Sequence, residues 1–289
     1  MKIALYSRKQ GTEEAQFIQT VIEYLQTQQF EVLVHANCPN TGAYPSFSNH
    51  NDLKQFTPVD FMVSIGGDGS FIDAANIVGD LNIPLAGINT GRIGFLSGIK
   101  KDNFKECFQM LLNHQYNIEK RSLLHVDTSV PTALETSFII NDLTIRATDT
   151  DSINAITVKA NGQKINTYWA DGLIIATPTG STAYSMSCGG PILHPQTQVV
   201  VLTPIASHSL SVRPLVIPAN VPLEISISGR GSQYALAVDT QRIKVNNSVK
   251  LYVRQEDFFM QTVLFDNTNF YDIIREKLLW GLDKRNITT

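Results

Sequence analysis

The sequence predicts an α/β domain with a parallel, Rossmann-like sheet, followed by a second, mainly β domain. In the first 110 residues, short apolar runs alternate with helical patterns, which is typical of a parallel sheet covered by helices. From Leu123 to about Leu264, β-rich runs are separated by turns, and there is almost no helical periodicity. The segment Phe270 to Leu282 is again amphipathic, and we expect a helix there that returns to the first domain.

In the first half, strands and helices are expected in alternation. Apolar residues predict a strand over residues 2–6, and residues 12–28 carry apolar side chains at helical spacing. Residues 36–58 are polar and contain three prolines, so we expect an irregular loop. The other expected elements are strands over 30–34, 61–65 and 84–88, a helix ending near Val78, and a helix near 102–112.

The second half is expected to consist mostly of strands. Asn161-Gly162 separates β-rich runs at 153–160 and 164–169, and this dipeptide favours a type I′ hairpin turn. Further strands are expected near 138–140, 172–177, 199–203, 223–228, 234–238 and 249–253. The predicted domains are therefore residues 1–118 together with about 266–289, and residues 119–265.

Composition and charge narrow the class of protein. The 26 acidic and 23 basic residues of this 289-residue chain nearly balance, which argues against a nucleic-acid or anionic-membrane surface. Three widely spaced cysteines without a CxxC pair indicate reduced thiols. The N-terminus lacks a signal-peptide pattern, and the longest apolar run, near 199–202, is far shorter than a membrane span. We therefore expect a cytoplasmic protein.

The first candidate site is Gly66-Gly67-Asp68-Gly69, between the strand at 61–65 and a predicted helix. Glycines let a ligand approach the main chain closely, and the N–H groups at the start of a helix favour phosphate. An aspartate opposes phosphate in such a cradle, so Asp68 is expected to accept a proton or to orient a hydroxyl or a metal. The alternative is a simple strand–turn–helix corner in which Asp68 caps the helix.

A second glycine-rich segment, residues 170–191, is dense in hydroxyl groups. Four hydroxyl residues occur within six positions, which exceeds what a turn needs and suits a ribose or a phosphate: Thr177, Thr179, Ser181 and Thr182. Tyr184 adds an aromatic face against which a base could lie. The alternative is an ordinary Pro/Gly turn between strands.

Two further polar pairs follow predicted strands. Asn141-Asp142 could read the donor and acceptor edge of adenine, or could open a turn. Asp239 and Gln241 have the same two interpretations, and solvation at the rim is the commoner role for either alone. The sequence contains no GxxxxGK[ST], HExxH or GxSxG motif and no GxGxxG after a strand, and its six scattered histidines give little support to a zinc site.

Taken together, these motifs resemble those of the NAD kinase family. GGDG alone is shared with diacylglycerol and sphingosine kinases, whereas GGDG followed later by TPTGSTAYS is highly specific. The resemblance spans roughly residues 60 to 245 in the same order, through Gly66-Gly67-Asp68-Gly69, residues 87–95, Asn141-Asp142, Asp171-Gly172, residues 177–185, residues 189–191 and residues 213–215.

The resemblance implies phosphoryl transfer from ATP to the 2′-hydroxyl of the adenosine ribose of NAD, which gives NADP. It implies Mg²⁺ or another divalent cation, while the balanced charge already argues against a nucleic-acid or membrane partner. It also implies a nucleotide-binding α/β domain joined to a sandwich-like β domain for NAD binding and oligomerisation, with the site between them. Because family sites are completed by a neighbouring subunit, a homo-oligomer is expected, either dimer or tetramer.

Residue by residue, the resemblance implies specific roles. Asp68 matches the proposed proton acceptor, and the glycines at 66, 67 and 69 match the phosphate-binding corner. Asp171 matches a carboxylate near the nicotinamide that is lent to another subunit. The full set of positions matched to NAD binding is Asp68, Gly69, Phe95, Asn141, Asp142, Asp171, Thr182, Ala183, Tyr184, Ser187 and Gln241.

The chain departs from the common family pattern at three positions. Asp142 replaces a glutamate and is one methylene shorter, so its reach toward ribose hydroxyls must be recovered by backbone position or water. Ser70 replaces a threonine, which should matter little. Trp169 replaces an arginine found in some members, so the phosphate contact of that arginine does not transfer.

Two other functions share some of these motifs. A lipid or small-molecule kinase would share GGDG but would need an apolar acceptor groove. A non-catalytic NADP(H)-binding sensor would share the fold. The motifs do not distinguish NAD from NADH, or ATP from polyphosphate. They assign no lysine or arginine to the ATP phosphates: Arg92 is a candidate, and a role in a surface loop is the alternative.

Overall fold

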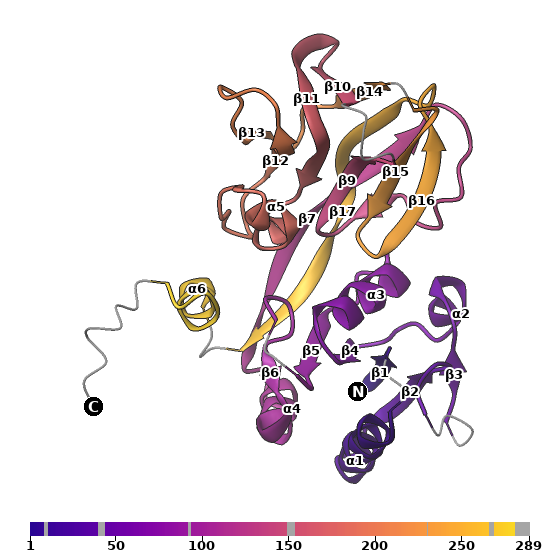
Figure 1. The fold of residues 1–289 in the computed structure, drawn as a ribbon. Coiled ribbons are helices and arrows are strands. Elements are labelled where there is room, and N and C mark those ends of the chain that lie inside the picture. The colour runs from indigo at the N-terminus through magenta and orange to yellow at the C-terminus, as the bar shows by residue number, and fades with distance from the viewer. Residues whose placement is uncertain are drawn as a thin grey trace, which may run out of the picture. The chain divides into compact units, whose positions relative to one another are not determined.

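The computed structural model describes residues 1–8, 11–39, 44–91, 94–148, 154–229, 231–265 and 269–280. The chain forms two compact units, here called unit 1 (Met1–Glu119 with Met260–Thr289) and unit 2 (Lys120–Phe259) (Figure 1). It leaves unit 1 within strand β7 (Tyr116–Thr128) and returns within β17 (Leu251–Phe265). The sequence predicts these boundaries near residues 118 and 266.

Unit 1 is built on a parallel sheet, as the sequence predicts. Strand β1 (Lys2–Ser7) pairs in parallel with β2 (Glu31–His35) on one side and with β4 (Phe61–Ile65) on the other. Beyond β2 lies β3 (Ser46–Phe47), and beyond β4 lies β5 (Leu85–Asn89), followed by β6 (Ile99–Lys100). The helices of this unit are α1 (Thr12–Thr27), α2 (His50–Gln55), α3 (Asp68–Val78), α4 (Phe104–Leu112) and α6 (Phe270–Leu278).

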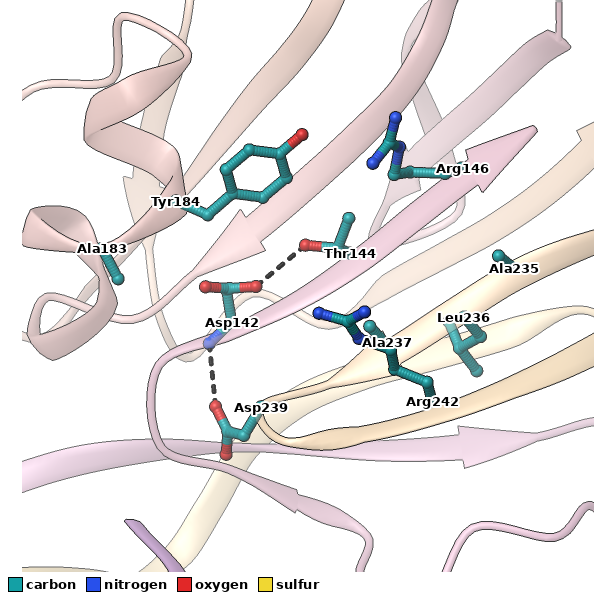
Figure 2. Close-up of a pocket in the computed structure, with 10 residues that line it drawn as sticks. All are labelled: Asp142, Thr144, Arg146, Ala183, Tyr184, Ala235, Leu236, Ala237, Asp239 and Arg242. Atoms are coloured by element: carbon teal, nitrogen blue, oxygen red, sulfur yellow. Dashed lines mark hydrogen bonds between the residues drawn. The ribbon is translucent and has the colours of Figure 1, made fainter. Parts of the chain in front are cut away.

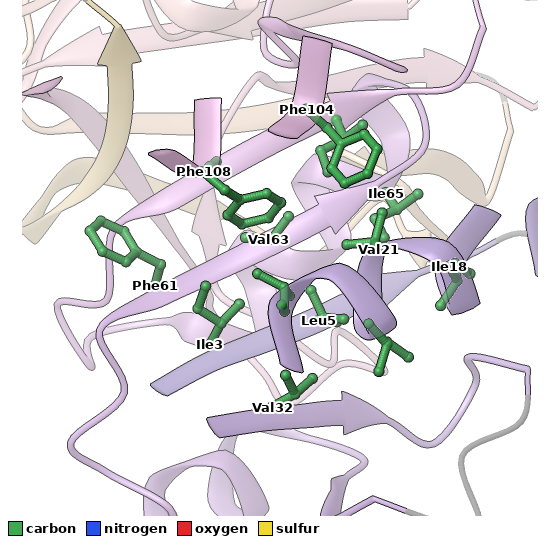
Figure 3. Packing of buried hydrophobic residues seen from close by; sticks show 14 of the residues in the cluster. Ile3, Leu5, Ile18, Val21, Val32, Phe61, Val63, Ile65, Phe104 and Phe108 are labelled. Carbon is green, nitrogen blue, oxygen red and sulfur yellow. The ribbon is translucent and has the colours of Figure 1, made fainter. Parts of the chain in front are cut away.

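The core of unit 1 explains why its strands read as continuous apolar runs. All five residues of β4 are buried, because a central parallel strand is covered on both faces. Alternate residues of β1 and β4 pack against α1 and α4 on one face (Figure 3). There Phe104 meets Phe17 edge to face, with ring centroids 5.5 Å apart.

The loop expected over residues 36–58 is only partly irregular, so that prediction is wrong in part. It contains β3 and the short helix α2, whose N-cap residue Asn49 accepts the N–H of Asp52 at 3.0 Å. Leu53 of α2 is completely buried. A helix of six residues is too short for a periodic pattern. Because prolines lie on both sides of it, its N-cap residue Asn49 was interpreted as part of a loop.

Unit 2 consists of antiparallel sheets that share the long strand β11 (Gln163–Ala176). The C-terminal half of β11 pairs with β9 (Asp142–Ala147) and β12 (Val199–Ser207), and β9 pairs on its other side with β15 (Gln233–Val238). The N-terminal half of β11 pairs with β10 (Asn154–Ala160). The remaining elements are β7, β8 (Phe138–Ile139), β13 (Leu215–Pro218), β14 (Leu223–Ser228), β16 (Gln241–Asn246), β17 and α5 (Tyr184–Ser187).

One core takes side chains from both sheets, which makes the unit sandwich-like. Leu143 and Ile145 of β9 and Leu173 of β11 belong to the same buried cluster as Ile156 of β10 and Ile225 of β14. The polar residues between them, including Thr144, alternate onto the opposite face of the sheet. A mainly β second domain is therefore confirmed.

Several element boundaries differ from those predicted. The hairpin at Asn161-Gly162 is confirmed, with φ of 49° and 78° at its two residues. The two strands expected at 164–169 and 172–177 are one continuous strand, and β7, β9, β13 and β16 were not predicted. Residue 153 of the expected strand 153–160 lies outside the described residues.

The C-terminal helix is present and belongs to unit 1, as expected, but it is shorter than predicted. α6 ends at Leu278 because Leu279 takes a left-handed conformation with φ of 52° and is exposed. Residues 281 and 282 of the predicted helix lie outside the described residues. Among the helices that the structure describes, none is long and apolar enough to span a membrane.

Candidate active site

The glycine corner of unit 1 joins β4 to α3. Gly66 has φ of 148°, a conformation that side chains rarely adopt. Gly67 is the N-cap residue of α3, and no side chain caps this helix. Asp68 is therefore the first residue of the helix rather than its cap, and the alternative reading of Asp68 as an N-cap is wrong. A Cβ on Gly67 would meet nothing within 4 Å, so open space lies above this residue.

The Asp68 carboxylate is held by a loop that follows β5. Its Oδ2 accepts the N–H of Phe95 at 2.8 Å, and its Oδ1 accepts the N–H groups of Leu96 at 3.1 Å and Ser97 at 3.3 Å. A Cβ on Gly94 would overlap this carboxylate, so only glycine allows the loop to approach so closely. The structure thus brings Asp68 and Phe95 together, whereas the roles of Leu96 and Ser97 were not predicted.

A paired charge lies beside the corner. Arg8 Nε is 2.7 Å from Asp73 Oδ2, its Nη2 donates to Asp73 Oδ1 at 3.1 Å, and the Tyr6 hydroxyl donates to Asp73 at 3.0 Å. A Cβ on Gly69 would lie 3.2 Å from Arg8 Nη1, so this arginine reaches the corner with its charge already paired. Arg92, the basic residue that the sequence singled out, lies outside the described residues.

Unit 2 contains a pocket of about 500 Å³ on the polar face of its sheet (Figure 2). Alternate residues of β9 face it, while Leu143 and Ile145 face the core. The small side chains of Ala235 and Ala237 on β15 leave space for the pocket. The lining residues are Asp142, Thr144, Arg146, Ala183, Tyr184, Ala235, Leu236, Ala237, Asp239 and Arg242.

The pocket carries charge of both signs. Asp142 accepts a hydrogen bond from the Thr144 hydroxyl at 2.8 Å, and burial raises the pKa of Asp142 above its ordinary value. Arg146 and Arg242 point into the same space (Figure 2). Neither guanidinium has a hydrogen-bond or ion-pair partner among the residues that the structure describes. Burial raises the pKa of Tyr184, and the nearby Arg146 charge partly opposes that shift.

Asp239 shapes the pocket through the backbone. Its carboxylate accepts the N–H groups of Ile140 at 2.8 Å, Asn141 at 2.7 Å and Asp142 at 3.1 Å. Burial outweighs these bonds and raises the pKa of Asp239 to about 7. The expectation that Asp239 is solvated at a rim is wrong, because the carboxylate is turned toward the β8–β9 turn.

Gln241 also has a structural partner. Its Oε1 accepts the N–H of Glu135 at 2.9 Å, and its Nε2 donates to the Thr136 hydroxyl. This amide therefore holds the 135–136 segment, and Gln241 is not among the pocket-lining residues.

The hydroxyl-rich turn forms a 3₁₀ helix (Thr179–Thr182) followed by α5. The hydroxyls of Thr177, Ser181 and Thr182 donate to the carbonyls of Ile140 at 2.6 Å, Pro178 at 2.6 Å and Thr179 at 3.3 Å, respectively. Most of these hydroxyls thus hold the turn, and the prediction that they exceed what a turn needs is wrong. What the turn presents to the pocket is Ala183 and Tyr184.

The structure brings some predicted residues together and leaves others apart. Asp142, Ala183 and Tyr184 share the pocket, whereas Ser187 and Asp171 are exposed and do not line it. Asp171 Oδ1 lies 3.8 Å from His208 Nε2. Thr144 and Arg146 of β9 and the pocket residues of β15 and β16 were not predicted. The period-two alternation of Asp142, Thr144 and Arg146 is the signal that could have found some of them.

Comparison with known proteins identifies the family. Residues 5–116 match the ATP-NAD kinase N-terminal domain, and residues 140–263 match the ATP-NAD kinase C-terminal domain. The chain belongs to the NAD kinase family. The matches therefore confirm the predicted family, the predicted phosphotransferase class and the predicted organisation in two parts.

Relatives within the NAD kinase family match nearly the whole chain. The NAD kinase of Cytophaga hutchinsonii is 35% identical over 99% of this chain and 100% of its own length. The NAD kinase of Flavobacterium psychrophilum is 41% identical over 93% of this chain and 90% of its own length.

Two solved structures share the fold. Yeast NADH kinase complexed with NADH has a TM-score of 0.85 at 23% identity, covering 100% of this chain and 90% of its own. An NAD kinase from Archaeoglobus fulgidus in complex with ATP has a TM-score of 0.73 at 22% identity, covering 95% and 99%. At these identities the likeness concerns the fold.

Proposed function

We propose that this NAD kinase family member transfers the γ-phosphoryl group of ATP to the 2′-hydroxyl of the adenosine ribose of NAD, giving NADP. The observation that carries the proposal is the Asp68 carboxylate, held by three backbone N–H groups beside a glycine corner with open space above Gly67. A carboxylate fixed in this way suits a hydroxyl acceptor, and open backbone N–H groups suit a phosphate donor.

Asp68 acts mainly by orientation. The transition state of phosphoryl transfer is loose, so a base has little to do early in the reaction, and positioning with charge neutralisation dominates. Asp68 orients the attacking 2′-hydroxyl and accepts its proton late. Gly66, Gly67 and Gly69 let the donor phosphates approach the start of α3 closely.

The pocket of unit 2 suits a dinucleotide. The Tyr184 ring, 37% exposed, offers a stacking face, and Asp142 offers carboxylate oxygens to ribose hydroxyls. Arg146 and Arg242 face the same space and match the negative charge of the NAD diphosphate. The NAD-binding roles that the resemblance implies for Gly69, Phe95, Asn141, Thr182, Ser187 and Gln241 belong to the same proposal.

Magnesium fits this site as a companion of ATP. Among the described residues, no group of three or more His, Cys, Asp or Glu side chains could hold a metal ion. Mg²⁺ needs no such cage, because it keeps several waters and binds mainly substrate phosphates. The Asp68 oxygens already accept three N–H groups, and in the proposed reaction the remaining acceptor capacity serves the 2′-hydroxyl, so the ion would be held mainly by phosphate oxygens and water. Bound Mg²⁺ would offset the charge of the ATP oxygens.

The proposal includes a homo-oligomer. Unit 2 exposes large apolar side chains, among them Leu210 at 93% and Trp169 at 55% exposure. Such groups are usual where another protein surface binds. Light scattering coupled to gel filtration measures the number of subunits directly.

The decisive experiment incubates the protein with ATP, Mg²⁺ and NAD and measures NADP. We expect NADP to form, and we expect Asp68→Asn to lower kcat by about 10³-fold while NAD still binds. Asp80→Asn is the matched control. It changes an exposed carboxylate just after α3 and should retain activity. Dinucleotide binding without turnover in the wild type would select the sensor function, and near-normal turnover of Asp68→Asn would remove Asp68 from catalysis.

A further inference from the structure

Lys277 on α6 lies beside the Asp68 loop within unit 1. Its Nζ stands 5.1 Å from the centroid of the Phe95 ring, and the N–H of Phe95 is the donor that binds Asp68 Oδ2 at 2.8 Å. The lysine is half-buried and interacts electrostatically with Asp68. It makes no ion pair with any residue that the structure describes.

An ammonium in this environment is unfavourable unless it meets an anion. Burial lowers the pKa of Lys277 to about 8, and the charges of Asp68 and the neighbouring Glu276 oppose that shift. The Glu276 carboxylate also forms an exposed ion pair with Lys100 on β6, at 3.5 Å, so it is not a dedicated partner of Lys277. A partly desolvated cation without an ion-pair partner is typical of a functional site.

The charges of the corner require a cation when ATP binds. Asp68 and the donor phosphates are both negative and meet at the same short segment. Arg8, which also reaches the corner, is held by two contacts to Asp73. Lys277 is thus the cation near Asp68 whose charge is not paired within the described part of the chain.

We propose that the Lys277 ammonium binds the phosphates of ATP beside Asp68 and neutralises the charge that the acceptor base and the donor bring together. This inference rests on the proposed function. The glycine corner itself contains no basic residue, and in this proposal Lys277 on the C-terminal helix provides the positive charge. The Phe95 ring positions the ammonium by a cation–π contact, and the N–H groups that point away from the ring can donate to phosphate oxygens.

Three variants test the role of the charge. We expect Lys277→Met to lower kcat/KM for ATP by about 10²-fold or more, as loss of one charge-stabilising group does in other enzymes. We expect Lys277→Arg to retain most of the activity. Lys105→Gln is the matched control, because Lys105 also stands over an aromatic ring, 5.7 Å from that of Tyr24, and takes no part in the site.

The pH profile gives a second readout that a purely structural lysine would not move. The ammonium is charged below its pKa and neutral above it, so kcat/KM for ATP should fall as the pH rises through about 8. Bound phosphates favour the charged form, so the same limb in kcat should lie at higher pH. In Lys277→Arg both limbs should move out of the accessible range, because arginine stays protonated.

The outcomes separate this inference from the proposed function. If the wild type forms no NADP, the proposed function fails. If it forms NADP while Lys277→Met stays within about threefold of wild type, or Lys277→Arg keeps the limb near pH 8, the inference is overturned. A thermal unfolding midpoint like that of the wild type shows that a variant is folded. Should Lys277→Met not fold, the pH profile of Lys277→Arg still decides the matter.

Discussion

Gly66 and Gly67 are adjacent glycines with different physical roles. Gly66 has φ of 148°, and a Cβ there would overlap the Ser70 hydroxyl, so the backbone itself requires glycine. Gly67 has an extended conformation, with φ of −96°, and a Cβ there would meet nothing within 4 Å. The fold therefore does not require glycine at 67, and the open space above it is left for a ligand.

We expect Gly67→Ser to keep its stability but lose activity. Serine is a favoured N-cap residue, so the free energy of unfolding should change by less than about 0.5 kcal/mol. Its hydroxyl would bind the N–H groups at the start of α3 and occupy the space of the donor phosphates, raising KM for ATP by about tenfold or more. Urea unfolding and steady-state kinetics measure the two effects.

Gly66→Ala is the contrasting variant. It should destabilise the protein by roughly 1–3 kcal/mol, because the residue is strained and overlaps Ser70. Equal losses of stability in Gly67→Ser and Gly66→Ala would contradict this division of roles.

At the residue scale, the sequence predicted the catalytic candidate Asp68 but not the groups that hold its carboxylate in place. Asp68 stood out because an anion in a phosphate cradle needs a role. The donors that hold it are the backbone N–H groups of Phe95, Leu96 and Ser97, and backbone donors leave no side-chain signature. Arg146 and Arg242 were missed because a charge on a short alternating strand usually lies on a solvated face.

At the scale of elements, one carboxylate connects two turns of unit 2. Asp239, where β15 ends and β16 begins, accepts three backbone N–H groups of the β8–β9 turn, from Ile140 to Asp142. This turn leads into β9, which carries Asp142 into the pocket. The position of a ligand-binding candidate is thus set by a residue on another hairpin.

Asp239→Ala should destabilise unit 2 and distort the pocket. Removing the carboxylate leaves three partly buried N–H groups without their acceptor, and we expect a loss of about 2–4 kcal/mol in the free energy of unfolding. Urea unfolding measures it. Asp257→Ala is the control: its side chain is 94% exposed, and it should change stability by less than about 0.5 kcal/mol. A small effect of Asp239→Ala would show that the turn is held by other contacts.

The same carboxylate predicts how this contribution varies with pH. The folded protein raises the pKa of Asp239 to about 7, whereas an aspartate in an unfolded chain has a pKa of about 3.9. The folded state therefore binds the proton more tightly, and the stabilisation is largest at low pH and is lost as pH rises from about 4 to 7. The stability difference between wild type and Asp239→Ala should be larger at pH 5 than at pH 8.

Which elements the sequence could predict follows from how they are buried. β1, β4 and β5 are covered on both faces and read as continuous apolar runs, so they were found. β9 and β16 are short and bury only one face, and their polar residues read as a turn or a rim. α2 was hidden for a related reason, since six residues give too little periodicity.

At the scale of the whole molecule, Asp171 raises the question of where its carboxylate acts. It lies on β11, is exposed, and is not among the residues that line the pocket of its own chain. Its neighbour His208 is 3.8 Å away. We therefore propose that, in a homo-oligomer, this carboxylate serves the site of another subunit.

Active-site complementation tests that arrangement. Asp68→Asn and Asp171→Asn should each be nearly inactive alone. In a mixed dimer, one of the two sites combines the intact Asp68 of one subunit with the intact Asp171 of the other. Random mixing in equal amounts should therefore restore about a quarter of the wild-type activity. Native mass spectrometry of the mixture, with the two variants carrying tags of different mass, shows whether subunits exchange. If subunits exchange and no activity returns, Asp171 serves the site of its own chain, because only a residue that crosses between subunits can complement.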